Sequence, residues 1–184
     1  MAVYTLIAGV DGVGKTSFLG ALVGCAKDIG VVVQDDLCKI SECIRNGVSF
    51  VRKSTLDSDI DDQIMRMARD AGYQVRLCYI AIDTAADCLA RIQNRVRHGG
   101  ADVPTDTVIQ RFNTRWDTLS KVLTQCNSVE IYDNDNGFSK VAEYQNDRFC
   151  AVERKIPTWL EDFLAFDDSS SYCRKRIEEH HVVK

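Results

Sequence analysis

The segment Gly9–Thr16 constrains this chain more than any other, because it carries the complete pattern GxxxxGK(S/T). An apolar run over residues 3–8 leads into it and predicts a buried parallel strand. A helical apolar pattern follows it. A strand, a glycine-containing loop and a helix in this order are the context in which the GxxxxGK(S/T) pattern forms a phosphate-binding loop. The sequence therefore predicts a nucleoside triphosphate as ligand. The predicted apolar face of the helix consists of Phe18, Leu19, Leu22, Val23 and Ala26.

Each part of the loop has a physical role toward a phosphate. Glycines let the backbone wrap with its N–H groups pointing inward, and the following helix adds the partial positive charge of its N-terminus. Lys15 can reach the β- and γ-phosphates, and the Thr16 hydroxyl can bind Mg²⁺. The residues predicted to contact ATP or GTP are Gly9, Asp11, Gly12, Val13, Gly14, Lys15, Thr16 and Ser17.

Composition narrows the class of protein. With 184 residues, of which 45% are hydrophobic, the chain has the size of a single compact domain over residues 1–184. Its 23 basic and 27 acidic residues give a net charge of −4, which offers no argument for a nucleic acid or an anionic membrane surface as partner. No apolar run is long enough to span a bilayer, and the N-terminus lacks a signal-peptide pattern. We therefore expect a cytoplasmic protein.

The eight cysteines do not indicate a metal site. They form no CxxC pair, and only three histidines are present, so zinc binding is poorly supported. Several cysteines fall in apolar patterns, such as Cys25 in the first predicted helix and Cys78 in a predicted strand. We interpret them as reduced thiols that act as small core residues.

Beyond the loop, predicted strands alternate with predicted helices. Apolar runs predict a short buried strand over 31–33 and further strands over 48–51, 73–82 and 128–132. The strand 128–132 is predicted to be the last of the sheet, and a hairpin is predicted over 140–153. Helical periodicity predicts helices over 37–45, 58–71, 84–98, 104–123 and 156–166, and the polar tail 167–184 is expected to be loosely ordered. The predicted fold class is the α/β fold of P-loop NTPases, with three layers (α/β/α), a mainly parallel sheet and a helical lid.

Several acidic residues follow predicted strands, where ligands bind in parallel α/β sheets. Phosphoryl transfer needs a residue that positions or deprotonates the nucleophile, and Asp35 and Asp36 after the second strand are the candidates. Asp83, directly after the strand 73–82, is the predicted partner of Thr16 in binding the metal ion. Lys53, Ser54 and Thr55 lie just past the end of the third predicted strand.

Arginines are placed to form a lid over residues 91–115. The helices 84–98 and 104–123 are joined by Gly99-Gly100, and each carries an arginine pair at i, i+4. A hairpin of these helices could bring cations onto the phosphates, as arginine fingers do. The alternative is an ordinary solvated face with surface ion pairs. The candidates are Arg91, Arg95, Arg97, Arg111 and Arg115.

A GTPase switch is the natural competitor for a small chain with this loop. That class recognises guanine through an Asn/Thr-Lys-x-Asp element after a late strand. The corresponding segment here, Asp133–Asn136, lacks the lysine. The pattern therefore favours a kinase over a switch.

The order of motifs resembles the zeta toxin family of P-loop kinases. The segments that carry the resemblance are the loop, the aspartate after the second strand, SFVRKSTL (49–56), GYQVRLCYIAID (72–83) and RVRHGGADVPTDTVIQRF (95–112). The last segment is similar to the family's lid pattern RVxxGGHxVPxxxIxRR(F/Y) and is the most specific. The resemblance covers roughly residues 4–164.

This resemblance implies an activity and roles for particular residues. Known members are ATP- or GTP-dependent kinases, the best described of which phosphorylate the 3′-hydroxyl of UDP-N-acetylglucosamine, and an antitoxin protein commonly blocks their nucleotide site. It implies Lys15 and Thr16 for the nucleotide and Mg²⁺, and Asp36 or Asp35 as the base on the substrate hydroxyl. It also implies that Arg95 and Arg111 of the lid hold the phosphates.

The chain differs from the family pattern at two positions. The family has E(S/T)TL after the third strand, and its Glu and Thr contact the substrate. This chain has Lys53-Ser54-Thr55-Leu56 there, so the resemblance implies Lys53, Ser54 and Thr55 as substrate contacts. In the lid, Ala101 replaces the histidine. Because Lys53 reverses the charge of one wall of the acceptor pocket, a more anionic small-molecule substrate is conceivable. Two alternatives stay open: a phosphotransferase for an antibiotic or nucleoside, and a nucleotide-binding protein without catalysis.

Overall fold

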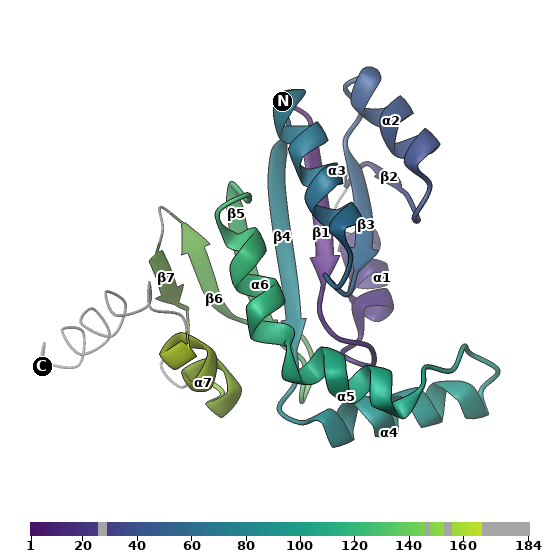
Figure 1. Ribbon diagram of the computed structural model, residues 1–184, viewed down its shortest axis with the longest axis vertical. Coiled ribbons are helices and arrows are strands. Elements are labelled where there is room, and N and C mark those ends of the chain that lie inside the picture. Colours follow the sequence, from purple (N-terminus) through teal and green to yellow (C-terminus); the bar gives the residue numbers. More distant parts are fainter. Residues whose placement is uncertain (26–28, 146–147, 153–155, 167–184) are drawn as a thin grey trace, which may run out of the picture.

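The strands form one sheet with the phosphate-binding loop near its centre. The computed structural model describes residues 1–25, 29–145, 148–152 and 156–166, and in this part of the chain seven strands lie in the order β2-β3-β1-β4-β5-β6-β7 (Figure 1). Strands β1 to β5 pair in parallel, and β6 and β7 add an antiparallel edge. The strands are β1 Val3–Ala8, β2 Val31–Val32, β3 Phe50–Ser54, β4 Gln74–Ala81, β5 Ser128–Asp133, β6 Ser139–Gln145 and β7 Arg148–Ala151.

Helices cover both faces of this sheet, as the predicted three-layer fold requires. Alternate residues of each central strand point to opposite faces, so Leu6 and Ile7 belong to different apolar clusters. The cluster of Leu6 includes residues of α2, α3, α6 and α7, and the cluster of Ile7 includes residues of α1, α4 and α5. The helices are α1 Lys15–Cys25, α2 Leu37–Arg45, α3 Asp59–Asp70, α4 Ala85–Arg97, α5 Thr105–Asn113, α6 Arg115–Leu123 and α7 Thr158–Phe166.

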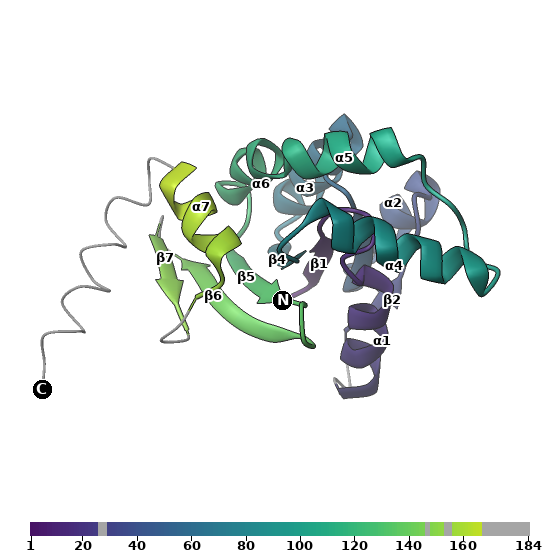
Figure 2. The ribbon, with the colours of Figure 1, turned by 90° about the horizontal axis from the view of Figure 1, so that it is seen from below.

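The parallel register gathers the predicted site at one edge of the sheet. Ala8, the last residue of β1, pairs with Ser54 at the end of β3 and with Tyr79 near the end of β4. Helices α4 and α5 lie together across the same edge (Figures 1 and 2). Ile92 of α4 and Phe112 of α5 pack in one cluster with Val13 of the loop. The lid helices therefore rest on the phosphate-binding loop.

Two predicted apolar surfaces are more exposed than expected. The strand 31–33 was predicted to be buried, and Val33 is, but Val31 and Val32 are 37% and 44% exposed, because β2 is the edge strand and pairs only with β3 among the described strands. On α1, Phe18 is buried while Val23 is 52% exposed, so only part of the predicted face meets the sheet. Ala26 and the tail 167–184 lie outside the described residues.

The third strand begins and ends later than predicted. It runs from Phe50 to Ser54, because its pairing with β1 continues to Ala8. Arg52, Lys53 and Ser54 are therefore within the strand and not past its end. This shift turns Arg52 into the interior of the fold, where it is 3% exposed.

The predicted helix 104–123 is two helices. Helix α5 ends at Asn113, α6 begins at Arg115, and Thr114 lies between them with its hydroxyl donating to the Gln110 carbonyl over 3.1 Å. Ile109, predicted on the apolar face, is 39% exposed, and the buried residues of α5 are Val108 and Phe112. The strand over 128–132 is not the last of the sheet, since the predicted hairpin forms β6 and β7 and extends it.

The described cysteines differ in burial, with Cys126 intermediate between two groups. Cys43, Cys78 and Cys88 are buried, as expected of small core residues, whereas Cys25, Cys38 and Cys150 are exposed. Among the described residues no cysteine is in a disulfide, and Cys173 lies outside them. No helix in the described part of the chain has the length and apolar character needed to span a bilayer.

Candidate active site

The phosphate-binding loop needs glycine at specific positions. Gly12 and Gly14 have φ values of 87° and 101°, which side-chain-bearing residues rarely adopt. A Cβ atom on Gly12 would lie 2.4 Å from the Cys88 carbonyl oxygen, and one on Gly14 would lie 2.6 Å from Nδ2 of Asn134. These two glycines thus allow close contact of the loop with α4 and with the segment after β5, although only Gly14 is a fixed position of the pattern.

Lys15 lies folded over its own loop. Its Nζ atom donates to the carbonyl oxygens of Gly9 (2.6 Å) and Val10 (3.0 Å). Burial lowers the pKa of Lys15 to about 8, and the charges of Arg111 and Lys53 act in the same direction while Asp11 opposes them. An ammonium group with this pKa gains by acquiring an anionic partner such as a phosphate.

Asn134 fixes the loop from the opposite side and was missed by the sequence prediction. Its Nδ2 donates to the Val13 carbonyl (2.8 Å), and its N–H donates to Ala81 at the end of β4 (3.0 Å). Nη2 of Arg91 on α4 donates to the Asn134 carbonyl over 2.6 Å. The polar segment after β5 was the available signal for this role. The sequence prediction used the segment only to exclude a GTPase, because it lacks the lysine of the guanine-recognition element.

Two open cavities of about 340 Å³ each adjoin at the loop. Asp11 and Lys15 line both, so the cavities meet at these side chains. The first cavity lies between the loop and α4, and is lined by Asp11, Gly12, Gly14, Lys15, Thr16, Ser17, Arg91, Ile92, Arg95 and Asn134. The second lies beyond the ends of β2 and β3, and is lined by Asp11, Lys15, Asp35, Arg52, Lys53, Ser54, Thr55, Asp57, Ser58, Ile60, Asp61 and Arg111.

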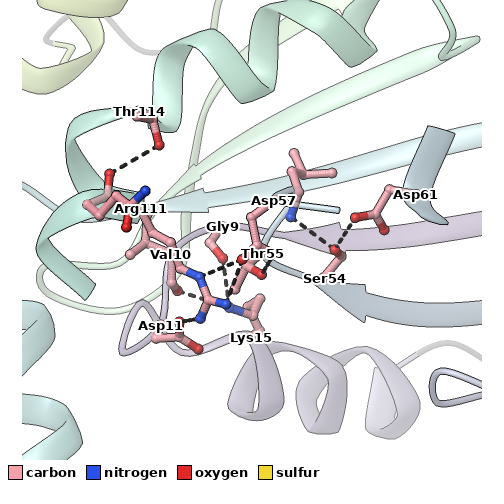
Figure 3. A network of polar contacts seen from close by, with 12 residues as sticks. Gly9, Val10, Asp11, Lys15, Ser54, Thr55, Asp57, Asp61, Arg111 and Thr114 are labelled. Carbon is pink, nitrogen blue, oxygen red and sulfur yellow. Dashed lines mark hydrogen bonds and ion pairs between the residues drawn. The ribbon is translucent and has the colours of Figure 1, made fainter. Parts of the chain in front are cut away.

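Arg111 connects the lid to both walls of the second cavity (Figure 3). Its Nη1 atom donates to Asp11 of the loop over 2.6 Å, and its Nε atom donates to Asp57, just before α3, over 2.7 Å. These partners raise its pKa against the opposing effect of burial. Among the other arginines, Arg91 and Arg95 line the first cavity.

Arg97 and Arg115 do not line either cavity. The Arg115 guanidinium stacks over the rings of Phe112 (3.8 Å) and Trp116 (4.2 Å), so it stabilises the junction of α5 and α6. Only Arg91, Arg95 and Arg111 of the arginine set line the cavities at the loop.

Asp35 and Asp36 are adjacent in sequence but have different surroundings. Asp36 is the N-cap of α2, and its Oδ1 atom accepts from the N–H groups of Cys38 (3.0 Å) and Lys39 (3.1 Å). Asp35 lines the second cavity, and its side chain is 72% exposed. Of the two candidates for a base, only Asp35 faces the space where an acceptor could lie.

A buried polar network lies beneath Asp35. The Arg52 guanidinium donates to Asp35 and to Asp61, which is 2% exposed. Ser54 Oγ donates to Asp61 over 2.7 Å and accepts from the Leu56 N–H over 2.9 Å. Leu56 has a φ of 61°, the only positive value at a non-glycine position among the described residues. Ser54, predicted to contact substrate, thus supports the turn at the cavity wall (Figure 3).

The two predicted metal ligands have different surroundings. Thr16 Oγ1 accepts from Nζ of Lys53 over 2.9 Å. Asp83 lines neither cavity, and its N–H donates to Asp135 (3.3 Å). Within the described residues no group of three or more His, Cys, Asp or Glu could hold a metal ion. Mg²⁺ commonly takes most of its ligands from phosphates and water, so the Thr16 hydroxyl fits as a single protein ligand.

Comparisons with known proteins identify a family model and solved folds that this chain matches. The model of the zeta toxin family matches residues 27–147, which is more than half of the chain. A sequence relative, an uncharacterized protein of Haemophilus influenzae, is 36% identical over 69 residues, which cover 38% of this chain and 49% of that protein. The matched part thus spans about half the length of this relative.

Solved structures share the fold at low sequence identity. The AvrRxo1-ORF1:AvrRxo1-ORF2 structure with sulphate ions superposes with a TM-score of 0.58 at 13% identity, over 88% of this chain and 63% of that chain. A structure of the same pair with ATP has a TM-score of 0.57 at 16% sequence identity, over 83% of this chain and 61% of that chain. A structure of the PezAT chromosomal toxin–antitoxin system of Streptococcus pneumoniae has a TM-score of 0.56 at 15% sequence identity, over 97% of this chain and 84% of that chain.

Proposed function

This chain belongs to the zeta toxin family, and from that premise we propose that it is a kinase that transfers the γ-phosphate of ATP or GTP to a hydroxyl group of a small molecule. The single observation that carries the proposal is the junction of the two cavities at Lys15 and Asp11. A nucleotide in the first cavity would place its terminal phosphate at this junction, next to an acceptor in the second.

The donor half of the reaction uses the loop and α4. Backbone N–H groups of the loop and the N-terminus of α1 bind the phosphates, and Lys15 neutralises the charge on the transferred group. Arg95, which lines the same cavity, contributes a second positive charge. Mg²⁺, held by Thr16 and the phosphates, would supply further charge neutralisation. We place the protein in the cytoplasm, where the nucleotide is available.

The acceptor half uses Asp35 as the general base. Its carboxylate is exposed to the second cavity, where it can accept the proton of an acceptor hydroxyl. Arg52 holds this carboxylate in place, and Thr55 and Lys53 offer polar contacts to the rest of the acceptor. Arg111 would leave Asp11 or Asp57 to contact the transferred phosphate, in keeping with the role implied for the lid.

The family membership favours a sugar nucleotide such as UDP-N-acetylglucosamine as acceptor. Lys53 adds a positive charge to the acceptor wall, which supports an acceptor with a phosphate or carboxylate group. The PezAT structure is that of a toxin–antitoxin system, and on that basis an antitoxin protein is the partner that we propose. A phosphotransferase for another small substrate differs from this proposal only in the occupant of the second cavity.

A transfer assay tests the proposal. The protein is incubated with Mg²⁺ and ATP labelled in its γ-phosphate, with UDP-N-acetylglucosamine, a nucleoside or a hydroxylated antibiotic offered separately, and labelled products are separated by chromatography. Label in one acceptor, absent with Lys15→Met, would support a kinase and name its substrate class. Nucleotide binding without transfer to any acceptor, including a metabolite extract, would favour the non-catalytic alternative.

A further inference from the structure

Lys53 occupies an unusual position between the two halves of the site. It belongs to β3, which pairs with β1 at Ile7, and its side chain lines the second cavity. Its Nζ atom nevertheless donates to Oγ1 of Thr16, the first-turn residue of α1, over 2.9 Å. A cation of the acceptor wall thus contacts the hydroxyl that is expected to bind Mg²⁺.

The two arginines of the second cavity are paired with carboxylates, whereas Lys15 donates to carbonyl oxygens of its own loop. Arg52 pairs with Asp35 and Asp61, and Arg111 with Asp11 and Asp57. Among the described residues, Lys53 has no carboxylate within ion-pair distance, and the Thr16 hydroxyl is the contact that holds it. Of the two cations that β3 contributes to this cavity, Lys53 can therefore move without breaking an ion pair, whereas Arg52 cannot.

The Thr16 hydroxyl cannot bind Mg²⁺ and the Lys53 ammonium group together without loss of binding energy. A Mg²⁺ ion bound to the hydroxyl lies at about 2.1 Å from the oxygen. With Lys53 Nζ at 2.9 Å from the same atom, the two positive charges would be at most about 5 Å apart, a distance at which like charges repel strongly. The hydroxyl hydrogen must also point away from both, which leaves its lone pairs as the shared acceptor.

We propose that Lys53 is a tethered cation that competes with Mg²⁺ for Thr16, and that binding of the metal–nucleotide complex displaces its ammonium group toward the second cavity. Lys53 is thus a positioning residue. When the metal–nucleotide complex occupies the donor half, the positive charge of Lys53 moves into the acceptor half. This inference rests on the proposed nucleotide site and concerns a residue that differs from the family pattern.

The test measures binding of a non-hydrolysable ATP analogue as a function of Mg²⁺ concentration, by calorimetry. Wild type is compared with Lys53→Met, which keeps the length and removes the charge, and with Lys53→Arg, which keeps the charge. Lys121→Met, an exposed lysine on α6 that lines neither cavity, is the matched control. Circular dichroism melting establishes that each variant is folded.

Lys53→Met should reach half-maximal analogue binding at a Mg²⁺ concentration roughly tenfold or more below that of wild type, Lys53→Arg and Lys121→Met. An equal Mg²⁺ requirement in wild type and Lys53→Met would overturn the inference and leave the nucleotide site intact. A Lys53→Arg protein that behaves like Lys53→Met would also overturn it, because charge would not be the cause. Analogue binding by none of the proteins at any Mg²⁺ concentration would overturn the proposed function as well.

Discussion

Nε of Arg52 donates to Oδ1 of Asp35 over 2.8 Å, which joins a buried cation of β3 to an exposed carboxylate beyond β2. The same guanidinium also pairs with buried Asp61. A flexible surface carboxylate would be a poorly positioned base, whereas this one is held from below by a side chain that packing has already fixed. The proposed acceptor half of the site is therefore organised by the core of the protein.

Replacement of Arg52 should destabilise the fold. Arg52→Met leaves Asp61 buried without its cation, and we expect the free energy of unfolding to fall by about 3–5 kcal/mol in urea denaturation. Arg66→Met, which removes an exposed arginine paired with Asp62 on α3, is the control and should change it by less than about 1 kcal/mol. Addition of Asp61→Leu to Arg52→Met should restore much of the loss. Equal stability of the two single variants would contradict the buried network.

Lys15 should contribute to binding at a cost in stability. Its pKa of about 8 in the folded protein is below that of an unfolded lysine, so folding is disfavoured by its charge at pH 7, and stability rises as the pH increases from about 8 to 10.4. Lys15→Met should abolish binding of an ATP analogue and leave the melting temperature at pH 7 equal to or above that of wild type. A lower melting temperature would show that Lys15 has a structural role.

Nucleotide affinity should depend on pH above neutrality. Phosphate contact favours the ammonium form of Lys15, so binding takes up a proton once the pH exceeds about 8, the pKa of Lys15 in the free protein. The dissociation constant of a fluorescent ATP analogue should rise by up to about tenfold per pH unit above 8, and change little between pH 6.5 and 7.5. A constant affinity between pH 7 and 9.5 would exclude Lys15 as the titrating contact.

Thiol labelling should distinguish two groups of cysteines. Burial raises the pKa of Cys78 and Cys126 to about 12 and that of Cys88 to about 11, so these thiols should resist alkylation in the native protein. Cys25, Cys38 and Cys150 are exposed and should react first, as mapped by mass spectrometry of peptides after brief iodoacetamide treatment. Early labelling of Cys78 would be inconsistent with the position of β4 in the sheet.

The parts of the fold that depend on neighbouring residues could be predicted from the sequence. The loop pattern is contiguous, and its glycines, Lys15 and Thr16 lie where a strand–loop–helix unit places them. Helix caps are equally local, as at Thr84, whose hydroxyl accepts from the N–H of Asp87. The alternation of strands and helices was enough for the three-layer fold.

The acceptor half could not be predicted in the same way, because its contacts join distant segments. Arg52 is charged and was placed outside the strand, and nothing nearby in sequence shows that Asp35 and Asp61 compensate its burial. Asp35 and Asp36 are distinguished only by the capping of α2, which follows from backbone geometry. Asp83 follows its strand as expected, but the direction of a side chain after a strand is not encoded in the pattern.

The most direct test of the account is the rate of phosphoryl transfer by Asp35→Asn and Asp36→Asn, measured with γ-labelled ATP and the acceptor found in the transfer assay. Both variants keep their local structure, because asparagine can still accept from Arg52 at position 35 and is a good N-cap at position 36. Asp35→Asn should bind the ATP analogue like wild type and lose at least about 10²-fold in transfer rate, whereas Asp36→Asn should stay near the wild-type rate. Transfer by Asp35→Asn at the wild-type rate would contradict the assignment of Asp35 as the base between the two cavities.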